Sequence, residues 1–155
     1  MAASLVAAGL LFACTPTLVA DGDGPVWCAE GPRIRIAGIA ARERDNSCRP
    51  GQPCPNSSAD AAMRALVNVL GGSRGSVRFR GARYDHVRVH APTMKCLSTG
   101  SAGGSRTGAF CQMSDGRNLS CAMLATRTVL RWDRYWRRDM VCSARDLPSD
   151  SQRGR

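Results

Sequence analysis

The chain has 155 residues, of which 43% are hydrophobic and 5% aromatic, and its formal net charge is +10. This length leaves room for one domain with an ordinary core rather than several. So high a positive charge favours polyanionic partners such as nucleic acid, anionic membrane surfaces or cell-wall polymers. A basic surface that only aids solubility is the alternative.

The N-terminus is typical of a signal peptide. Leu5 to Ala13 is an apolar run, too short to span a bilayer, although it lacks a preceding Lys or Arg. The chain has eight cysteines, which indicates an oxidising compartment. Cleavage after Ala20, or acylation of Cys14 as in a lipoprotein, would leave a cysteine without a partner. We therefore predict a signal peptide at 1–13 and a periplasmic or secreted protein.

Short strands and a tight turn are predicted to follow. Residues 15–20 read as a first strand, which Pro16 confines to an edge or a strand start. Asp21–Gly24 is a turn, and Val26–Cys28 begins the return strand. Charged and apolar residues then alternate in Arg33–Ile39, as in a strand with one face in the core.

The middle of the chain predicts a helix between a polar loop and further strands. Residues 45–56 are rich in Pro and Gly, and from Ser58 to Leu70 apolar residues recur at helical spacing. Gly71-Gly72 ends this helix. Strand-like segments follow at 76–89, 93–97 and 107–113.

A second helix and an aromatic cluster come next. Asn118 is placed to cap a helix from Leu119 to about Arg131. The aromatic residues that follow, interleaved with arginines, are Trp132, Tyr135 and Trp136. Such residues suit nucleic-acid binding, because rings stack on bases and arginines follow the backbone. Packing against the end of the helix is the alternative. The domain is predicted at 14–142, with a polar, disordered tail at 143–155.

The cysteines predict disulfides rather than a zinc site. None is in CxxC spacing, and neither His86 nor His90 extends a cysteine cluster. Adjacency of the predicted elements alone suggests four pairs. These pairs are Cys14–Cys28, Cys48–Cys54, Cys96–Cys111 and Cys121–Cys142.

The order of elements suits an α+β fold that is mainly β. Short strands, a helix after the third of them, more strands and a closing helix are typical of a five-stranded barrel of the OB type, here with two to three helices and stapled by disulfides. We expect a monomer without a membrane-spanning segment.

The layout of several motifs resembles the staphylococcal-nuclease-like (thermonuclease) family. Asp21-Gly22-Asp23 resembles its DGDT turn, and the stretch from Arg33 to Glu43 resembles its IRLxGIDxPE-like segment. Three later segments resemble the family as well. Residues 104–109 resemble its YGRxxA segment, and Asp115-Gly116-Arg117 with Leu119 resembles its DGxxL turn. Val129–Trp132 resembles its GLARRW-like helix end. Together these motifs extend from about Thr15 to Trp136, and the resemblance implies the OB-type barrel.

The resemblance also implies a phosphodiester-cleaving site. Asp23 would be a calcium ligand, and Asp21 or Asp45 is the candidate to compensate for the carboxylate that Ala40 lacks. Arg35 and Arg106 would clamp the phosphate, since planar paired donors match two phosphate oxygens. Glu43 would be the general base for the attacking water. The chain departs from the motifs at four positions. Gly24 stands where the family has threonine, and Ala40 stands where it has its second metal-binding aspartate. Arg42 replaces a proline and Arg127 a glycine.

Two functions follow from this comparison. The first is metal-assisted hydrolysis of DNA or RNA by an exported protein, with an incomplete calcium site because Ala40 carries no carboxylate. The second is a catalytically inactive barrel that binds nucleic acid or another polyanion. The predicted nucleic-acid contacts are Trp132, Tyr135 and Arg134. Taken singly, the acidic turn, the arginines and Glu43 would be an ordinary turn and ordinary surface charges.

Overall fold

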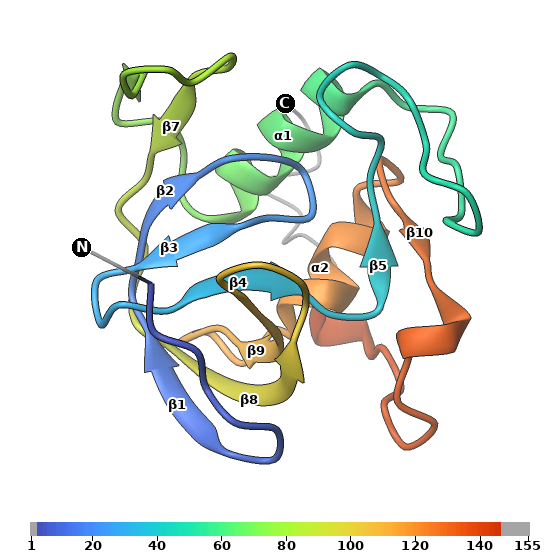
Figure 1. Cartoon of the computed structure of the whole chain (residues 1–155). Helices are drawn as coiled ribbons and strands as arrows, with labels where there is room; N and C mark the ends of the chain where they lie inside the picture. Colours follow the sequence, from blue (N-terminus) through green and yellow to red (C-terminus); the bar gives the residue numbers. More distant parts are fainter. Residues whose placement is uncertain (1–2, 147–155) are drawn as a thin grey trace.

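The computed structural model describes residues 3–146, which are mainly β with two α-helices (Figure 1). The strands are β1 (Leu11–Cys14), β2 (Pro16–Val19), β3 (Val26–Cys28), β4 (Arg33–Ile36), β5 (Ile39–Ala40), β6 (Ser76–Val77), β7 (His86–Arg88), β8 (Met94–Ser101), β9 (Arg106–Gln112) and β10 (Leu130–Arg131). The helices are α1 (Ala59–Val69) and α2 (Leu119–Ala125), with 3₁₀ turns η1 (Asp133–Tyr135) and η2 (Ala144–Asp146). Within this part of the chain, no helix has the length and apolar character of a membrane span.

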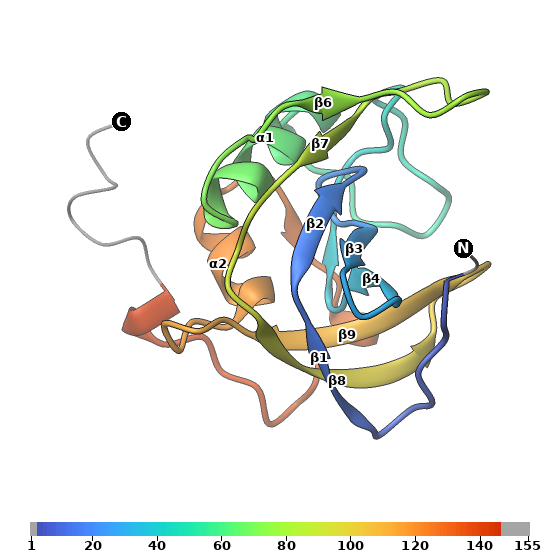
Figure 2. The ribbon, with the colours of Figure 1, turned by 90° about the vertical axis from the view of Figure 1, so that its left-hand side faces the viewer.

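Eight strands form one mixed sheet in the order β1-β8-β9-β4-β3-β2-β7-β6, while β5 pairs with β10 in a separate ribbon. Neighbouring strands of the sheet are antiparallel except β4 and β9, which are parallel. Thr15 alone separates β1 from β2, yet β1 pairs with β8 and β2 pairs with β3. The sheet therefore curls strongly, as Figure 2 shows.

The predicted α+β class is confirmed, but the sheet has eight strands where five were predicted. β1 was not predicted as a strand, whereas the short hairpin β6–β7 lies within the strand-like segment predicted at 76–89 but adds to the count of five. β1 comes from the stretch assigned to a signal peptide, 1–13, and pairs along β8 from Leu11↔Leu97 to Cys14↔Met94. The hairpin adds to β2 through Leu18↔Arg88 and Val19↔Val87. Both additions give hydrogen-bonding partners to strand edges that would otherwise be open.

Helix α1 agrees closely with its prediction. Ser58 is the N-cap, and its Oγ accepts a hydrogen bond from the N–H of Ala61 at 3.1 Å. Gly71 and Gly72 have positive φ angles of 97° and 101° and end the helix. Its buried residues are Ala59, Ala62, Met63, Leu66 and Val67, the face expected from the periodicity. This face packs with α2 and the inner side of the sheet to form the core.

Helix α2 is shorter than predicted, and the extension to about Arg131 was wrong. Asn118 caps it as expected, with its side chain accepting from the N–H of Cys121. The helix ends at Ala125, and Arg127 adopts a left-handed φ of 61° that a continuing helix does not allow. The chain then turns back as β10, whose Leu130 lies opposite Ala40 of β5.

All four predicted disulfides are confirmed, and the described residues contain no free cysteine. Cys96 and Cys111 face each other across β8 and β9, whereas Cys48–Cys54 closes a surface loop. Beyond Cys142, the predicted end of the domain, Asp146 is buried and accepts N–H bonds from Asn118 and Ser143, each at 2.7 Å. The rest of the predicted tail, 147–155, lies outside the described residues.

Removing the Cys96–Cys111 bridge by a double substitution to alanine should lower the free energy of unfolding by roughly 3 kcal/mol, because the bridge closes a loop of 15 residues. The Cys48–Cys54 pair is the matched control. It closes only 6 residues, so its loss should cost less, about 2 kcal/mol. Urea denaturation of both double variants measures the difference, and a larger loss for the short loop would contradict this ranking.

Candidate functional site

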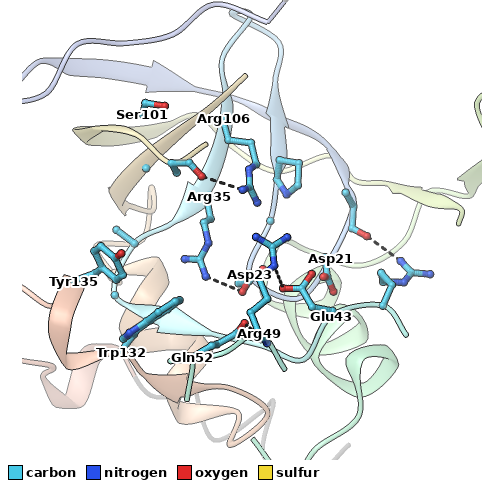
Figure 3. A pocket seen from close by; sticks show the side chains of 18 of the residues that line it. Asp21, Asp23, Arg35, Glu43, Arg49, Gln52, Ser101, Arg106, Trp132 and Tyr135 are labelled. Carbon is cyan, nitrogen blue, oxygen red and sulfur yellow. Dashed lines mark hydrogen bonds and ion pairs between the residues drawn. The ribbon is translucent and has the colours of Figure 1, made fainter. Parts of the chain in front are cut away.

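A pocket of about 640 Å³ opens where the β2–β3 turn, the segment after β4 and the β8–β9 turn meet (Figure 3). Its polar and aromatic lining includes Asp21, Asp23, Arg35, Glu43, Arg44, Arg49, Gln52, Arg83, Tyr84, His86, Thr99, Ser101, Arg106, Trp132 and Tyr135. The predicted site residues among these come from five separate stretches of sequence. The pocket is therefore a product of the fold and not of any one motif.

The tight turn between β2 and β3 places the two aspartates. A Cβ built on Gly22 would lie 2.5 Å from the Cβ of Ala62 in α1, so only glycine lets the turn approach the helix. Gly24 has a φ of 109°, which favours glycine, and any side chain there would approach the carbonyl oxygen of Ile34 to 2.6 Å. Because these close contacts fix the turn, Asp23 is held in the wall of the pocket, and only 8% of its surface is exposed.

Strand alternation places Arg35. In β4 the side chains of Ile34 and Ile36 are fully buried, and those of Arg33 and Arg35 lie on the opposite face. The guanidinium of Arg35 donates to Oδ2 of Asp23 at 3.0 Å and to the carbonyls of Ile36 and Ile39, each at 3.2 Å. Arg35 is thus held in a fixed position beside a buried carboxylate.

Asp23 has a second donor on the same oxygen. The N–H of Ala41 donates to its Oδ2 at 3.1 Å. Burial raises the pKa of Asp23, while the charge of Arg35 and the Ala41 N–H act in the opposite direction. The ion pair between Asp23 and Arg35 is well shielded from solvent, with the two side chains 11% and 17% exposed.

Asp21 and Glu43 add two more carboxylates to the pocket. Glu43 forms an ion pair with Arg49 at 3.1 Å, and Arg49 comes from the loop that the Cys48–Cys54 disulfide closes. Burial, then the negative charge of Asp23, raise the pKa of Asp21 to about 7, and the charge of Glu43 adds to this effect. Asp21 therefore changes its protonation state near neutral pH.

The pKa of Asp21 predicts a pH-dependent stability. In the folded protein Asp21 keeps its proton up to about pH 7, whereas in the unfolded chain it loses the proton near pH 4. The free energy of unfolding should therefore fall as the pH rises from about 4 to about 7. Asp21→Asn should remove this part of the decline, which amounts to at most a few kcal/mol. Urea denaturation at about pH 5 and about pH 8 measures it. Asp60→Asn, at an exposed carboxylate of α1, is the control, and equal pH slopes for wild type and Asp21→Asn would refute the assignment.

Arg106 lies at the opposite side of the pocket, at the start of β9. Its guanidinium donates to the backbone carbonyls of Ala102 and Gly103 at 2.9 and 3.3 Å. Among residues 3–146 it forms no ion pair with a carboxylate. Its charge is therefore available to an anion that enters the pocket, unlike the charge of Arg35.

The aromatic residues after β10 divide between the pocket and the core. Trp132 and Tyr135 line the pocket, with ring centroids 4.9 Å apart, and the guanidinium of Arg35 lies 5.6 Å from the Trp132 ring. Trp136 instead packs edge-on against Phe110. Arg134 is exposed and does not line the pocket. The packing alternative thus holds for Trp136, and nucleic-acid binding by Trp132 and Tyr135 stays a prediction.

Several lining residues were not predicted. Arg49 and Gln52 arrive through the disulfide-closed loop, and Arg83, Tyr84 and His86 arrive through the β6–β7 hairpin. The only sequence signal for the first pair was the Cys48–Cys54 clip close to Glu43. Arg44, next to Glu43, donates to the carbonyl of Ala20 at 2.9 Å and so ties this segment to the end of β2.

The calcium ion that the resemblance implies needs roughly six to eight oxygen ligands at about 2.3–2.6 Å. Within residues 3–146, the one group of three side chains whose ligand atoms lie within 4.8 Å of one another is Cys121, Cys142 and Asp146. Its two sulfurs are joined in a disulfide and do not ligate metals. The pocket carboxylates Asp21, Asp23 and Glu43 are not among such groups in this part of the chain.

The pocket's own contacts also disfavour calcium. Oδ2 of Asp23 already accepts two hydrogen bonds, and the carbonyl of Ala41 accepts one from the amide of Gln52. Ala40 supplies no ligand atom beyond its backbone. As the side chains lie, these residues do not fit a calcium ion.

The pocket brings together seven of the predicted site residues, namely Asp21, Asp23, Arg35, Glu43, Arg106, Trp132 and Tyr135. Comparisons with protein-family models, with curated proteins and with solved structures find no match to this chain. Its function is therefore argued from the chemistry of this pocket.

Proposed function

We propose that the protein binds nucleic acid through a phosphodiester in this pocket and hydrolyses that bond slowly, as a nuclease-like phosphodiesterase. The observation that supports this most is that five arginines, three carboxylates and the rings of Tyr84, Trp132 and Tyr135 line one pocket. Guanidinium groups suit phosphate, and aromatic rings suit the bases that flank it. The net charge of +10 favours the same partner.

The resemblance to the staphylococcal-nuclease-like family supports the same function. We infer that β2, β3, β4, β9 and β8 correspond to the five strands of an OB-type barrel, with β1 linking its two ends. The parallel pairing of β4 with β9 and the position of α1 between β5 and β8 in the chain are consistent with this correspondence. β6 and β7 are then an addition to the barrel.

The residues of the chain suggest how hydrolysis would proceed. Arg106 binds a non-bridging phosphate oxygen, and Arg35 adds positive charge while keeping its contact with Asp23. Glu43 takes a proton from water as the water oxygen bonds to phosphorus, and the bond from phosphorus to one sugar oxygen breaks. The leaving oxygen takes its proton from solvent. The arginines act by stabilising the charge that develops on the phosphate oxygens.

Binding without cleavage is the second candidate. It is favoured by the poor fit of calcium, because without a metal the water is activated by Glu43 alone. Oε1 of Glu43 is also engaged by Arg49 at 3.1 Å, which leaves only its other oxygen free to accept from a water. Arg106, Trp132 and Tyr135 would serve binding equally well in either case.

A cleavage assay separates the two candidates. Fluorescently labelled single-stranded DNA and RNA are incubated with the protein in calcium or in EDTA. One portion is resolved on a native gel to show binding, and another on a denaturing gel to show cleavage. We expect slow cleavage that differs little between calcium and EDTA and that disappears in Glu43→Gln purified in the same way. Binding without cleavage would support the second candidate, and failure to bind either strand would overturn both.

The four disulfides indicate an oxidising compartment. We propose that this compartment is the periplasm or the exterior of the cell and that the protein acts there as a monomer on DNA or RNA. Non-reducing mass spectrometry of protein recovered from the cell envelope or medium should show no free thiol.

A further inference from the structure

The loop of the β6–β7 hairpin, residues 78–85, carries a second basic and aromatic surface. It contains three arginines and a single acid, Asp85, which pairs with Arg78 at 2.7 Å. Arg80 and Arg83 are exposed. The hairpin projects from the edge of the sheet in Figure 2. We call this surface, formed by Phe79, Arg80 and Arg83, the hairpin platform.

Phe79 is exposed and yet held in a fixed orientation. Its ring stacks on Trp27 at 5.2 Å with an interplanar angle of 11°, and His86 lies edge-on to both rings at 5.1 and 5.3 Å. The guanidinium of Arg33 lies 3.8 Å from the Trp27 ring. Phe79 nevertheless keeps 38% of its surface exposed. A rigid aromatic ring open to solvent among arginines is the arrangement on which unpaired bases stack.

The packing of this cluster is not optimised for stability alone. Nε1 of Trp27 and Nδ1 of His86 are buried, and neither has a hydrogen-bond partner among the described residues. A buried polar atom without a partner costs stability. The cluster therefore keeps Phe79 in place in spite of this cost, which is consistent with a role outside folding.

The hairpin platform is continuous with the candidate site. Arg83, Tyr84 and His86 line the pocket, and the ring of His86 also contacts that of Phe79. A strand whose phosphodiester is bound at Arg106 would thus meet the hairpin on leaving the pocket. The positive charges of Arg80 and Arg83 favour a polyanion, and the exposed ring of Phe79 favours a polyanion that carries bases, which is a nucleic acid.

We propose that the hairpin platform binds single-stranded nucleic acid next to the pocket, with a base stacked on Phe79 and the backbone along Arg80 and Arg83. This inference rests on the proposed function and extends it, because it makes the protein prefer unpaired strands longer than the pocket itself holds. The competing explanation is that Phe79 only packs the hairpin against β3.

The test compares a labelled single-stranded oligonucleotide with a dinucleoside monophosphate, which occupies the pocket alone. Phe79→Ala should weaken oligonucleotide binding roughly five- to hundredfold, as expected for one base–aromatic stack, and should leave dinucleoside binding unchanged. Phe79→Tyr keeps the ring and should restore affinity. Equal oligonucleotide affinity for Phe79→Ala and wild type would overturn the platform while the pocket stands, whereas a wild type that binds neither probe would overturn the proposed function.

A second measurement does not depend on a variant. Ultraviolet cross-linking of the wild-type protein to an oligonucleotide containing 5-iodouracil, followed by peptide mapping, should give a cross-link at Phe79, which does not line the pocket. Cross-links confined to other segments would overturn the platform even if Phe79→Ala fails to fold.

Discussion

Arg106→Ala should weaken the binding of a single-stranded oligonucleotide roughly ten- to hundredfold at low salt. This range corresponds to the loss of one hydrogen bond to a charged group, about 1.5–3 kcal/mol. Arg106 bonds only to backbone carbonyls among the described residues and so meets an incoming phosphate without first breaking an ion pair. Fluorescence anisotropy over a salt series measures the effect. The log–log slope should become less steep by about 0.7, as for one lost phosphate contact.

Arg64→Ala is the matched control for charge. Arg64 is an exposed arginine of α1, paired with Asp60, and it does not line the pocket. Its removal lowers the net charge by the same amount and should change affinity by less than about twofold, since exposed charges away from a contact are screened. Equal losses for both variants would mean that general charge, and not the pocket, causes the binding.

Ala40→Asp should create calcium binding that the wild-type protein lacks. Ala40 is fully buried, and the next residue donates its N–H to Asp23, so a carboxylate at position 40 would lie close to that of Asp23. Without metal, two buried acids repel each other, and we expect a lower melting temperature. With calcium, the second anionic ligand is worth on the order of a few kcal/mol at an effective dielectric constant near 20. Stability should then recover, because calcium binds only the folded state.

Calorimetry in calcium and in EDTA tests this prediction, with Ala40→Asn as a neutral control of the same size as aspartate. A calcium-induced rise in melting temperature is expected for Ala40→Asp alone. Calcium-dependent cleavage should also appear in this variant and vanish again when it is combined with Glu43→Gln or Arg106→Ala. A wild-type protein that calcium stabilises equally would show that another residue completes the site.

Features that depend on neighbouring residues were predictable from the sequence. The cap at Ser58, the apolar face of α1 and the four disulfides between adjacent elements all follow from local patterns. The end of α2 was missed, although the resemblance places a glycine where Arg127 stands, and glycine is the usual residue at a positive φ. Local patterns likewise gave no reason to expect β1, whose strand pairing is with β8, far away in the sequence.

The site was predictable only where a motif supplied it. Asp23, Arg35 and Glu43 were identified from their order and spacing, and they do line one pocket. The contacts that determine their chemistry join residues that are far apart in the sequence. The Asp23–Arg35 pair and the amide of Gln52 on Ala41 depend on how the turn, the strand and the disulfide loop pack together. Residues of the β6–β7 hairpin reach the pocket for the same reason, and a one-dimensional pattern does not contain that information.

Hydrogen–deuterium exchange with and without a single-stranded oligonucleotide tests most directly whether the pocket is the binding site. We expect slower exchange in three segments that border the pocket, namely the Asp21–Gly24 turn, the loop at 42–52 and the stretch 102–106, which comprises the β8–β9 turn and the first residue of β9. Exchange in α1 and α2 should stay unchanged. Protection that leaves all three segments unaffected at saturating oligonucleotide would contradict the proposal that this pocket binds nucleic acid.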